Sequence, residues 1–191
     1  MQIVEHCELK KFSEFFSKFV FPSTTAIHYA TTTRRYYNFA YFQYIAYQAE
    51  VLKHFGVDGD IQRDSWEFSF TYAFGFYALM RTSLEACRKL CDAIASEDTN
   101  GELKKYRELY RESIKRIVDI ANDVVKHPFV PIASQPGGLD MTGAMDIYRW
   151  TEEDDSFKNV TVSPGQDQKT VHAYIEGLAE ILSTFQTPAA K

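Results

Sequence analysis

The feature that most constrains this chain is a pair of long segments in which apolar residues recur in steps of three and four. The first segment carries them at Trp66, Phe70, Ala73, Tyr77, Met80, Leu84, Cys87, Cys91 and Ile94. The second segment has Leu103, Tyr106, Tyr110, Ser113, Ile117, Ile120 and Val124 at the same spacing. Residues three and four apart lie on one face of a helix, so each segment predicts a long helix with one apolar stripe.

The connection between these two segments is too short for anything but a reversal. Only Asp98-Thr-Asn-Gly101 separates them, so the two helices should pack antiparallel along their stripes. We expect the first helix over residues 64–95. The second is expected over residues 100–127, because Pro128 disfavours helical geometry at the residue before it. The fold class that follows is all-α, an antiparallel bundle of about five helices.

The rest of the chain predicts three more helices and a small β-hairpin. Helical spacing of apolar residues favours a short helix over residues 8–21, an aromatic-rich helix over 33–55 and a last helix from Asp167, as its N-cap, to 186. Two strands, Met145–Trp150 and Asn159–Val162, flank an acidic turn. We therefore expect one helical domain over 1–191, with a core bundle at 33–128, a loop and β-hairpin at 129–166 and a C-terminal helix at 167–186.

Composition indicates a globular protein with a large core. The chain is 45% hydrophobic and 15% aromatic, and its formal net charge of -5 argues against a protein whose main partner is a polyanion. Three cysteines and no secretory leader pattern favour the cytoplasm. The most apolar run, Phe68–Met80, is too short to span a bilayer, so no membrane partner is expected.

Arg81 and Glu85 form a charged pair beside the apolar stripe of residues 66–94. In one interpretation Glu85 simply pairs with Lys89 one turn later on the same helix surface. In the other, Arg81 and Glu85 face the end of the next helix and join a polar cluster there. Such a cluster would supply hydrogen-bond and ion-pair partners for charged groups that lie beside a packed apolar stripe.

The end of the helix predicted over 100–127 contains an unusual set of polar residues. Asn122 is a poor helix former, and its place among apolar neighbours indicates that its amide binds something specific. Lys126 and His127 lie in the last turn, where cations interact favourably with exposed carbonyl groups. Two interpretations stay open, a simple capping role for His127 and a polar site that joins it to Asn122.

The helix with Arg81-Thr-Ser-Leu-Glu85, followed by a helix ending in Ala121-Asn-Asp-Val-Val-Lys-His-Pro128, resembles the HEPN-type helical bundles of prokaryotic defence and toxin-antitoxin systems, especially their abortive-infection-like and uncharacterised branches. The resemblance covers residues 33–128. In ribonuclease members of that superfamily the last helix has an arginine, usually followed by a polar residue, and a histidine one or two turns later. Two subunits bring these residues together to cleave RNA.

This chain departs from that pattern at the arginine. Asn122 and His127 match the polar residue and the histidine, but Ala121 stands where the arginine would be. Without its guanidinium, metal-independent cleavage loses the group that stabilises charge on the phosphorus centre, unless Arg81 or Arg116 substitutes. The resemblance therefore implies the fold, and it implies a protein without the usual catalytic arginine.

Several other features have an ordinary structural interpretation. Cys87 and Cys91 lie one turn apart on the apolar stripe, which favours two small core residues over a zinc site lacking further ligands. The aromatic segment Tyr36–Tyr47 favours a core or subunit interface over a surface that stacks bases. The basic stripe of Lys104, Arg107, Arg111 and Lys115 alternates with acidic residues, which is typical of a solvated face.

Two main functions follow from these observations, and a third interpretation stays open, a bundle that binds a small molecule in a pocket between the helices predicted over 33–55, 64–95 and 100–127. The first is a non-catalytic HEPN-like protein that acts by association with itself or with a protein partner, as a homodimer formed through the aromatic segment. The alternative is an RNase-like or nucleotide-acting enzyme of a prokaryotic defence or toxin-antitoxin system, metal-independent, with Asn122 and His127 as catalytic residues and Arg81, Glu85 and Lys126 as binding residues. RNA is the less favoured partner. We expect no cofactor and no metal.

Overall fold

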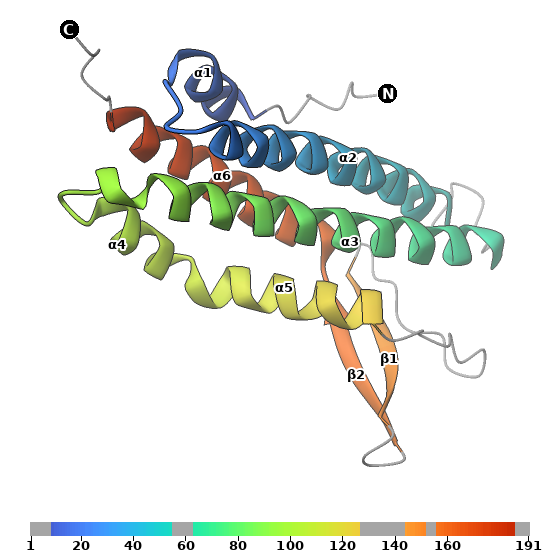
Figure 1. The fold of residues 1–191 in the computed structure, drawn as a ribbon. Helices are drawn as coiled ribbons and strands as arrows, with labels where there is room; N and C mark the ends of the chain where they lie inside the picture. Colours follow the sequence, from blue (N-terminus) through green and yellow to red (C-terminus); the bar gives the residue numbers. More distant parts are fainter. Residues whose placement is uncertain (1–8, 55–62, 127–143, 152–155, 186–191) are drawn as a thin grey trace, which may run out of the picture.

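The computed structural model describes residues 9–54, 63–126, 144–151 and 156–185. Figure 1 shows a bundle of helices from which a β-hairpin projects. Two long helices, α2 (Thr24–His54) and α3 (Arg63–Ile94), lie side by side and antiparallel. The prediction of an antiparallel helical bundle with a β-hairpin before the C-terminal helix is confirmed.

The predicted reversal after α3 is built from a short helix and a capped turn. The 3-10 helix η1 (Ala95–Glu97) follows α3, and α4 (Glu102–Leu109) begins after Gly101, whose φ of 68° lies in the left-handed region that glycine tolerates. The carboxylate of Asp98 accepts hydrogen bonds from the backbone N–H groups of Leu103 at 3.3 Å and Lys104 at 3.2 Å. Asp98 therefore satisfies donors at the start of α4 that have no partner within the helix.

The helix predicted over residues 100–127 is two helices, α4 and α5 (Arg111–Lys126), separated at Tyr110. Tyr110 has φ -96° and ψ 0°, and its N–H bonds to the carbonyl of Glu108. One position of the predicted apolar stripe differs next to this break. Ser113, predicted on the apolar stripe, is exposed, and Ile114 packs against the core, while Ile117 and Ile120 are buried as predicted.

The first two helices differ from the prediction at their boundaries. α1 (Lys10–Lys18) is shorter than the predicted helix over 8–21. α2 begins nine residues before residue 33, because the hydroxyl of Ser23 accepts a hydrogen bond from the N–H of Ala26 at 3.1 Å and caps the helix there.

The hairpin pairs β1 (Met145–Thr151) with β2 (Ser156–Val162), three residues longer at its second strand than predicted, and it leads into α6 (Pro164–Thr184). The prediction that Asp167 caps this helix is wrong. Pro164 occupies the first turn, where its missing N–H costs nothing, and the N–H of Asp167 already bonds to the carbonyl of Ser163 at 2.9 Å.

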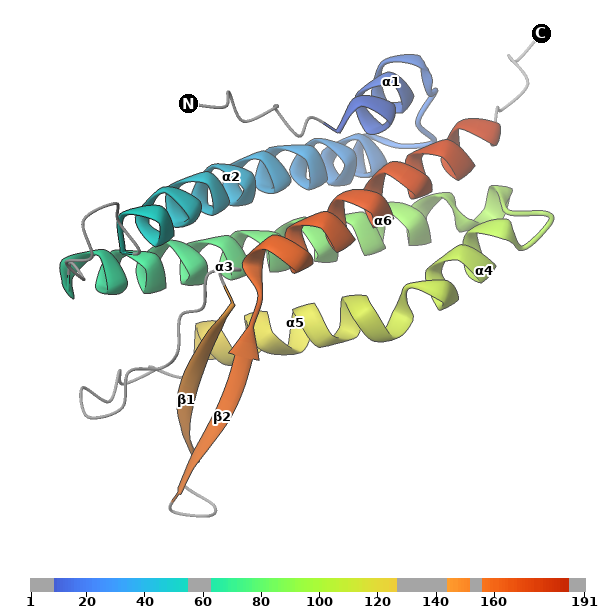
Figure 2. The ribbon, with the colours of Figure 1, turned by 180° about the vertical axis from the view of Figure 1, so that it is seen from behind.

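One hydrophobic core joins the helices α1 to α6. Figure 2, the view from behind, shows α6 lying across α2 and α3, which brings its apolar residues against theirs. Cys87 and Cys91 are free thiols buried in this core, as predicted for small core residues. Within the described ranges no helix is both long enough and apolar enough to cross a bilayer.

Candidate functional site

Three of the residues predicted to form a site line one surface pocket. Arg81 and Glu85 reach it from α3, and Asn122 reaches it from α5. The pocket has a volume of about 520 Å³ and is bounded by α3, α4, α5 and α6; we call it the α3–α5 pocket. It is lined by Arg81, Leu84, Glu85, Arg88, Arg107, Arg111, Ile114, Lys115, Val118, Asn122 and Tyr174.

The other two predicted residues cannot be placed in this pocket from the described part of the chain. Lys126 is the last residue of α5, and its side chain lies outside the described part of the structure. His127 lies outside the described residues. The association of His127 with Asn122 stays a prediction.

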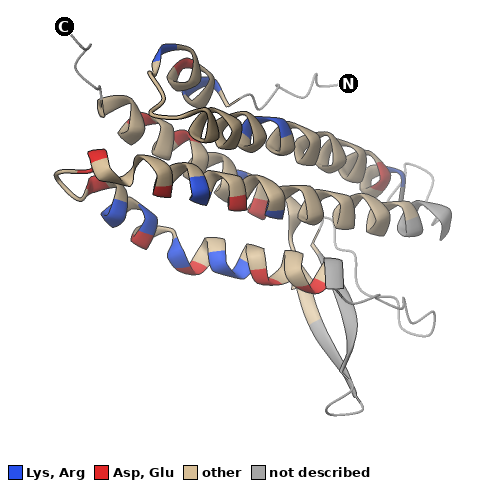
Figure 3. Cartoon of the chain, in the orientation of Figure 1, with Lys and Arg blue, Asp and Glu red and all other residues tan. Residues whose placement is uncertain are grey.

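Four cationic residues of the pocket were not predicted as part of a site. Arg107, Arg111 and Lys115 belong to the stripe interpreted as a solvated face, and Arg88 was not singled out. Arg111 and Lys115 share one face of α5 by their spacing of four, whereas Arg107 belongs to α4, on the other side of the break at Tyr110. Figure 3 shows the Lys and Arg positions of α4 and α5, with acidic positions between them.

Glu85 is held by cations of its own helix. Arg88 donates to its two carboxylate oxygens at 2.8 and 3.2 Å, and the ammonium of Lys89 lies 3.7 Å away. The hydrogen bond from Arg88 lowers the pKa of Glu85 below its ordinary value, so this carboxylate is charged at neutral pH. The simple pairing of Glu85 along the helix therefore exists, and the same residue also lines the pocket.

Asp92, on the next turn of α3, ties two guanidinium groups together. It accepts hydrogen bonds from Arg88 at 3.1 Å and from Arg107 at 2.9 Å. Arg111 pairs with Glu108 at 2.9 Å. Three of the five Lys and Arg side chains that line the pocket are therefore paired with carboxylates of α3 and α4.

Arg81, Lys115 and the side-chain amide of Asn122 differ from these paired groups. Among the described residues, none of the three has a hydrogen bond or ion pair from its side chain. The pocket therefore keeps an excess of positive charge, with five Lys and Arg side chains against three carboxylates that line it or pair with its cations, Glu85, Asp92 and Glu108, on a chain whose formal net charge is -5.

The floor of the α3–α5 pocket is apolar. Leu84 is buried, Ile114 and Val118 pack against the core, and Tyr174 of α6 is 6% exposed. Burial raises the pKa of the Tyr174 hydroxyl well above its ordinary value, so it stays neutral. Tyr106 and Tyr110 contact its ring, with centroids at 6.2 and 5.5 Å. A cationic rim therefore surrounds an aliphatic and aromatic base.

The two arginines that were considered as substitutes for a catalytic arginine lie in different places. Arg81 lines the pocket with Asn122. Arg116 is ion-paired with the buried carboxylate of Asp167. Ala121 is fully buried in the core, so a longer side chain at that position has no space without rearrangement.

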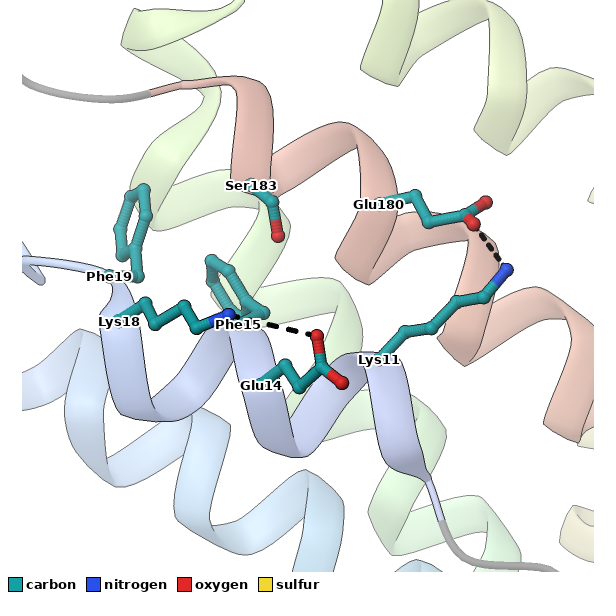
Figure 4. Close-up of a pocket in the computed structure, with 7 residues that line it drawn as sticks. All are labelled: Lys11, Glu14, Phe15, Lys18, Phe19, Glu180 and Ser183. Atoms are coloured by element: carbon teal, nitrogen blue, oxygen red, sulfur yellow. Dashed lines mark hydrogen bonds and ion pairs between the residues drawn. The ribbon is translucent and has the colours of Figure 1, made fainter.

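A second pocket of the same volume, about 520 Å³, lies between α1 and α6, and its charges are balanced. Figure 4 shows Lys11 reaching Glu180 and Lys18 reaching Glu14, with Phe15 of α1 and Phe19, the residue that follows α1, beside them. Each cation faces a carboxylate, so this pocket has no excess charge to attract an ion.

The outward surface of α2 is the second candidate for function. Phe39 is 48% exposed and Phe42 is 57% exposed, and Ala46 and Ala49 continue the stripe in steps of four and three. Arg35 and Lys53, both exposed, mark its two ends. We call these four apolar residues with their two flanking cations the α2 face. Large aromatic side chains exposed in a row are typical of an association surface.

Comparisons with protein-family models, with curated proteins and with solved structures produced no match to this chain.

Proposed function

We propose that this protein is a non-catalytic, HEPN-like helical bundle that acts by association, and that its first partner is a second copy of the chain bound through the α2 face. The exposure of Phe39 and Phe42 on a helix whose opposite side lies in the core carries this proposal. Burying two aromatic side chains that now contact water stabilises a dimer in proportion to the apolar area removed.

The order of large and small residues along the α2 face supports an antiparallel pair. Phe39 and Ala49 lie five residues on either side of Tyr44, and Phe42 and Ala46 lie two residues on either side. A two-fold axis on the exposed side of α2, at the level of Tyr44 along the helix, sets Phe39 against the partner's Ala49 and Phe42 against the partner's Ala46. Each aromatic ring then packs over a small residue, the complementary arrangement that isologous contacts require.

The ends of the α2 face fit the rim of such a contact. Arg35 and Lys53 bound the apolar stripe, and Lys53 is already neutralised by Glu50 of the same helix at 2.6 Å. Charged residues around an apolar centre are the usual composition of a protein interface. A parallel pair would instead oppose Phe42 to Phe42 and leave Ala46 facing Ala46, with a gap.

Sedimentation velocity across a range of protein concentrations tests the association. The wild type is expected to sediment as a dimer, and Phe42→Ser as a monomer with unchanged far-UV circular dichroism. Leu109→Ser is the matched control, because Leu109 on α4 is exposed and lies outside the α2 face. A wild type that stays monomeric at every concentration contradicts the proposal.

Cysteine cross-linking tests the orientation. In a Cys7→Ser background, the double variant Phe39→Cys/Ala49→Cys should form a covalent dimer on mild oxidation, because a disulfide needs Cβ atoms about 4 Å apart. Each single variant should stay uncross-linked, since a two-fold antiparallel pair separates identical positions by about 15 Å. Cross-linking of either single variant would indicate a parallel pair and would remove the antiparallel arrangement.

The sequence resemblance supports the proposed family and role, and the cysteines support the proposed location. The matched residues 81–85 and 121–128 support a place among HEPN-like proteins, with a role in prokaryotic defence. The free thiols of Cys87 and Cys91, one turn apart and unlinked, fit a reducing compartment such as the cytoplasm. Expression in a native host followed by fractionation tests the location.

One observation favours the second candidate, an RNase-like enzyme. Arg81 and Asn122 line the same cationic pocket, which would supply a guanidinium beside the polar residue of the family pattern. Under this function His127→Ala abolishes cleavage of a structured RNA and leaves the melting temperature nearly unchanged. A wild type that cleaves no RNA, with or without an added divalent cation, removes this candidate.

A further inference from the structure

We propose that Cys87 and Cys91 of α3 form a two-coordinate site for a soft monovalent metal ion, copper(I). The two residues lie one helical turn apart in the hydrophobic core, and both are free thiols. This inference concerns the interior of the bundle, so it stands or falls independently of self-association through the α2 face.

The helical spacing of the two cysteines suits an ion with two ligands. Residues four apart on a helix have Cβ atoms about 5–6 Å apart. A disulfide needs Cβ atoms about 3.5–4.5 Å apart, so a regular helix disfavours that link. Two thiolate–metal bonds in a line, each roughly as long as the 2.3 Å zinc–thiolate bond, need sulfur atoms about 4–5 Å apart. Side-chain rotation alone can supply that separation on α3.

The donor set selects the class of metal. Thiolates are soft ligands, and copper(I) is a soft cation that two of them can hold. Zinc requires four ligands, and within the described ranges no third histidine, cysteine, aspartate or glutamate joins this pair. Magnesium and calcium prefer oxygen ligands. A reducing compartment, which the free thiols fit, also keeps copper in the monovalent state.

Arg107 of α4 supplies a compensating charge. Copper(I) displaces one proton from each thiol, so the bound ion and its two thiolates together carry one negative charge. Arg107 lies against this turn of α3, where it donates a 2.9 Å hydrogen bond to Asp92, the residue after Cys91. A cation placed beside the ligands stabilises an anionic complex that the apolar core alone would disfavour.

In the free protein Cys87 is a neutral thiol. Its hydrogen bond with Cys91 and its burial raise the pKa of Cys87 well above its ordinary value, and the charge of Arg107 opposes them only in part. A neutral buried thiol is a poor nucleophile, so ordinary thiol chemistry is slow here. A soft cation that displaces the proton is the reactant to which such a pair responds best.

The α3–α5 pocket gives a route to the thiols, which are themselves buried. Cys87 is 1% exposed and Cys91 is 0% exposed. Arg107 and Tyr174 line that pocket, and both lie close enough to Cys87 for electrostatic interaction with it. Copper(I) carried by small thiolate ligands is an anionic complex, so the excess positive charge of the pocket favours its approach.

Anaerobic competition with bicinchoninate, a chelator whose copper(I) complex is coloured, tests the proposal on the full-length, reduced protein. The wild type is expected to take one copper(I) per chain and to gain an ultraviolet thiolate-to-copper absorption band. Cys87→Ala and Cys91→Ala should each lose both the copper and the band. Cys7→Ala is the matched control and should bind copper(I) like the wild type.

Two further measurements separate a site from a pair of core residues. Copper(I) should raise the melting temperature of the wild type and leave that of Cys91→Ala unchanged, because an ion that binds only the folded state stabilises it. Arg107→Gln should weaken copper(I) binding about ten-fold or more, the usual effect of removing a group that supports metal ligands. Arg111→Gln, which removes an exposed arginine paired with Glu108, should bind like the wild type.

Three results would overturn the proposal. The first is a wild type that takes no copper(I) from the chelator. The second is copper(I) binding that neither Cys87→Ala nor Cys91→Ala weakens. The third is one copper(I) per two chains, which would place the ion between copies. If both alanine variants fail to fold, X-ray absorption of the copper-loaded wild type decides, because two sulfur neighbours support the site and nitrogen or oxygen neighbours contradict it.

Failure here is distinguishable from failure of the proposed self-association. Phe42→Ser lies on the α2 face and is expected to bind one copper(I) per chain as a monomer. Conversely, Cys87→Ala is expected to dimerise like the wild type, since Cys87 is buried and is not part of the α2 face.

Discussion

The hydroxyl of Tyr77 on α3 donates a 2.6 Å hydrogen bond to the carboxylate of Asp167 on α6. Asp167 is 0% exposed, and the guanidinium of Arg116 on α5 is ion-paired with its other oxygen. Three helices therefore meet at one buried carboxylate. Burial raises the pKa of Asp167, while the hydrogen bond from Tyr77 and the charge of Arg116 act in the opposite direction. Removing either Tyr77 or Arg116 therefore leaves the buried carboxylate of Asp167 with one partner fewer.

Tyr77→Phe should lower the free energy of unfolding by about 1–3 kcal/mol, the cost of leaving a buried polar group without its hydrogen-bond partner. Urea denaturation followed by circular dichroism measures this change. Tyr36→Phe is the matched control, because Tyr36 is half-buried and no hydrogen bond of its hydroxyl is found in the described part of the chain; a change within about 0.5 kcal/mol is expected. Equal losses in both variants would contradict a special role for Tyr77.

His172 on α6 should make stability depend on pH near neutrality. The amide of Gln168 donates to the hydroxyl of Tyr37 at 2.9 Å, and that hydroxyl lies 2.9 Å from Nδ1 of His172. Burial lowers the pKa of His172 below its ordinary value, and nearby Glu176 only partly opposes this. A lowered folded-state pKa means that the stabilising contribution is present above about pH 6.5, the ordinary histidine value, and is lost as the pH falls through the folded pKa.

Chemical denaturation of wild type and His172→Gln between pH 7.5 and pH 5 isolates this effect, since the remaining titrating groups are common to both proteins. The wild type should lose more stability than the variant as the pH falls. Parallel curves for the two proteins would show that His172 does not titrate with folding.

The helix α3 was predictable because its apolar residues follow helical spacing over many turns. Ala73, Met80 and Cys87 are buried as that spacing requires. The break at Tyr110 was not predictable, since neither glycine nor proline marks it. It lies where Tyr106 and Tyr110 pack against Tyr174, a contact between segments far apart in the chain. Tertiary packing of this kind overrides local helix preference.

The candidate site was predictable in part for a similar reason. The sequence pointed to Arg81, Glu85 and Asn122 because charged and amide side chains beside an apolar stripe need hydrogen-bond or ion-pair partners. Arg107, Arg111 and Lys115 alternate with acidic residues along the chain, so their sequence pattern resembles that of an ordinary solvated helix. Their shared surface depends on how α4 and α5 lie against α3, which spacing within one helix does not specify. Asp167 was misassigned because an acidic residue near a helix start is also typical of a cap.

Glu176 should hold α1 against the bundle. Its two carboxylate oxygens accept hydrogen bonds from the backbone N–H groups of Lys11 at 3.0 Å and Phe12 at 3.1 Å, and Leu9 provides no side-chain cap. Glu176→Ala removes the partner of two free donors and the negative charge at the N-terminus of the helix, so a loss of about 1 kcal/mol is expected. Hydrogen exchange should accelerate in residues 10–18.

The control for this change is Glu180→Ala, which removes only an exposed ion pair with Lys11. Exposed pairs contribute little, so exchange in α1 should stay close to that of the wild type. If both variants accelerate exchange equally, α1 is held by surface charge and not by the backbone cap.

Gly177 on α6 should resist a substitution that normally stabilises helices. Replacing a helical glycine with alanine usually adds up to about 1 kcal/mol. Here the new Cβ would lie 2.6 Å from the Cζ atom of Tyr106, whose hydroxyl also donates to the carbonyl of Ala173 at 3.1 Å. The ring of Tyr106 must move and give up that hydrogen bond, so Gly177→Ala should instead cost about 1–3 kcal/mol, the range for overpacking a core. In a Tyr106→Ala background the obstacle is gone, and the same substitution should become neutral or stabilising. A double-mutant cycle by urea denaturation measures this reversal of sign, and an equal cost of Gly177→Ala in both backgrounds would mean that the two residues do not interact.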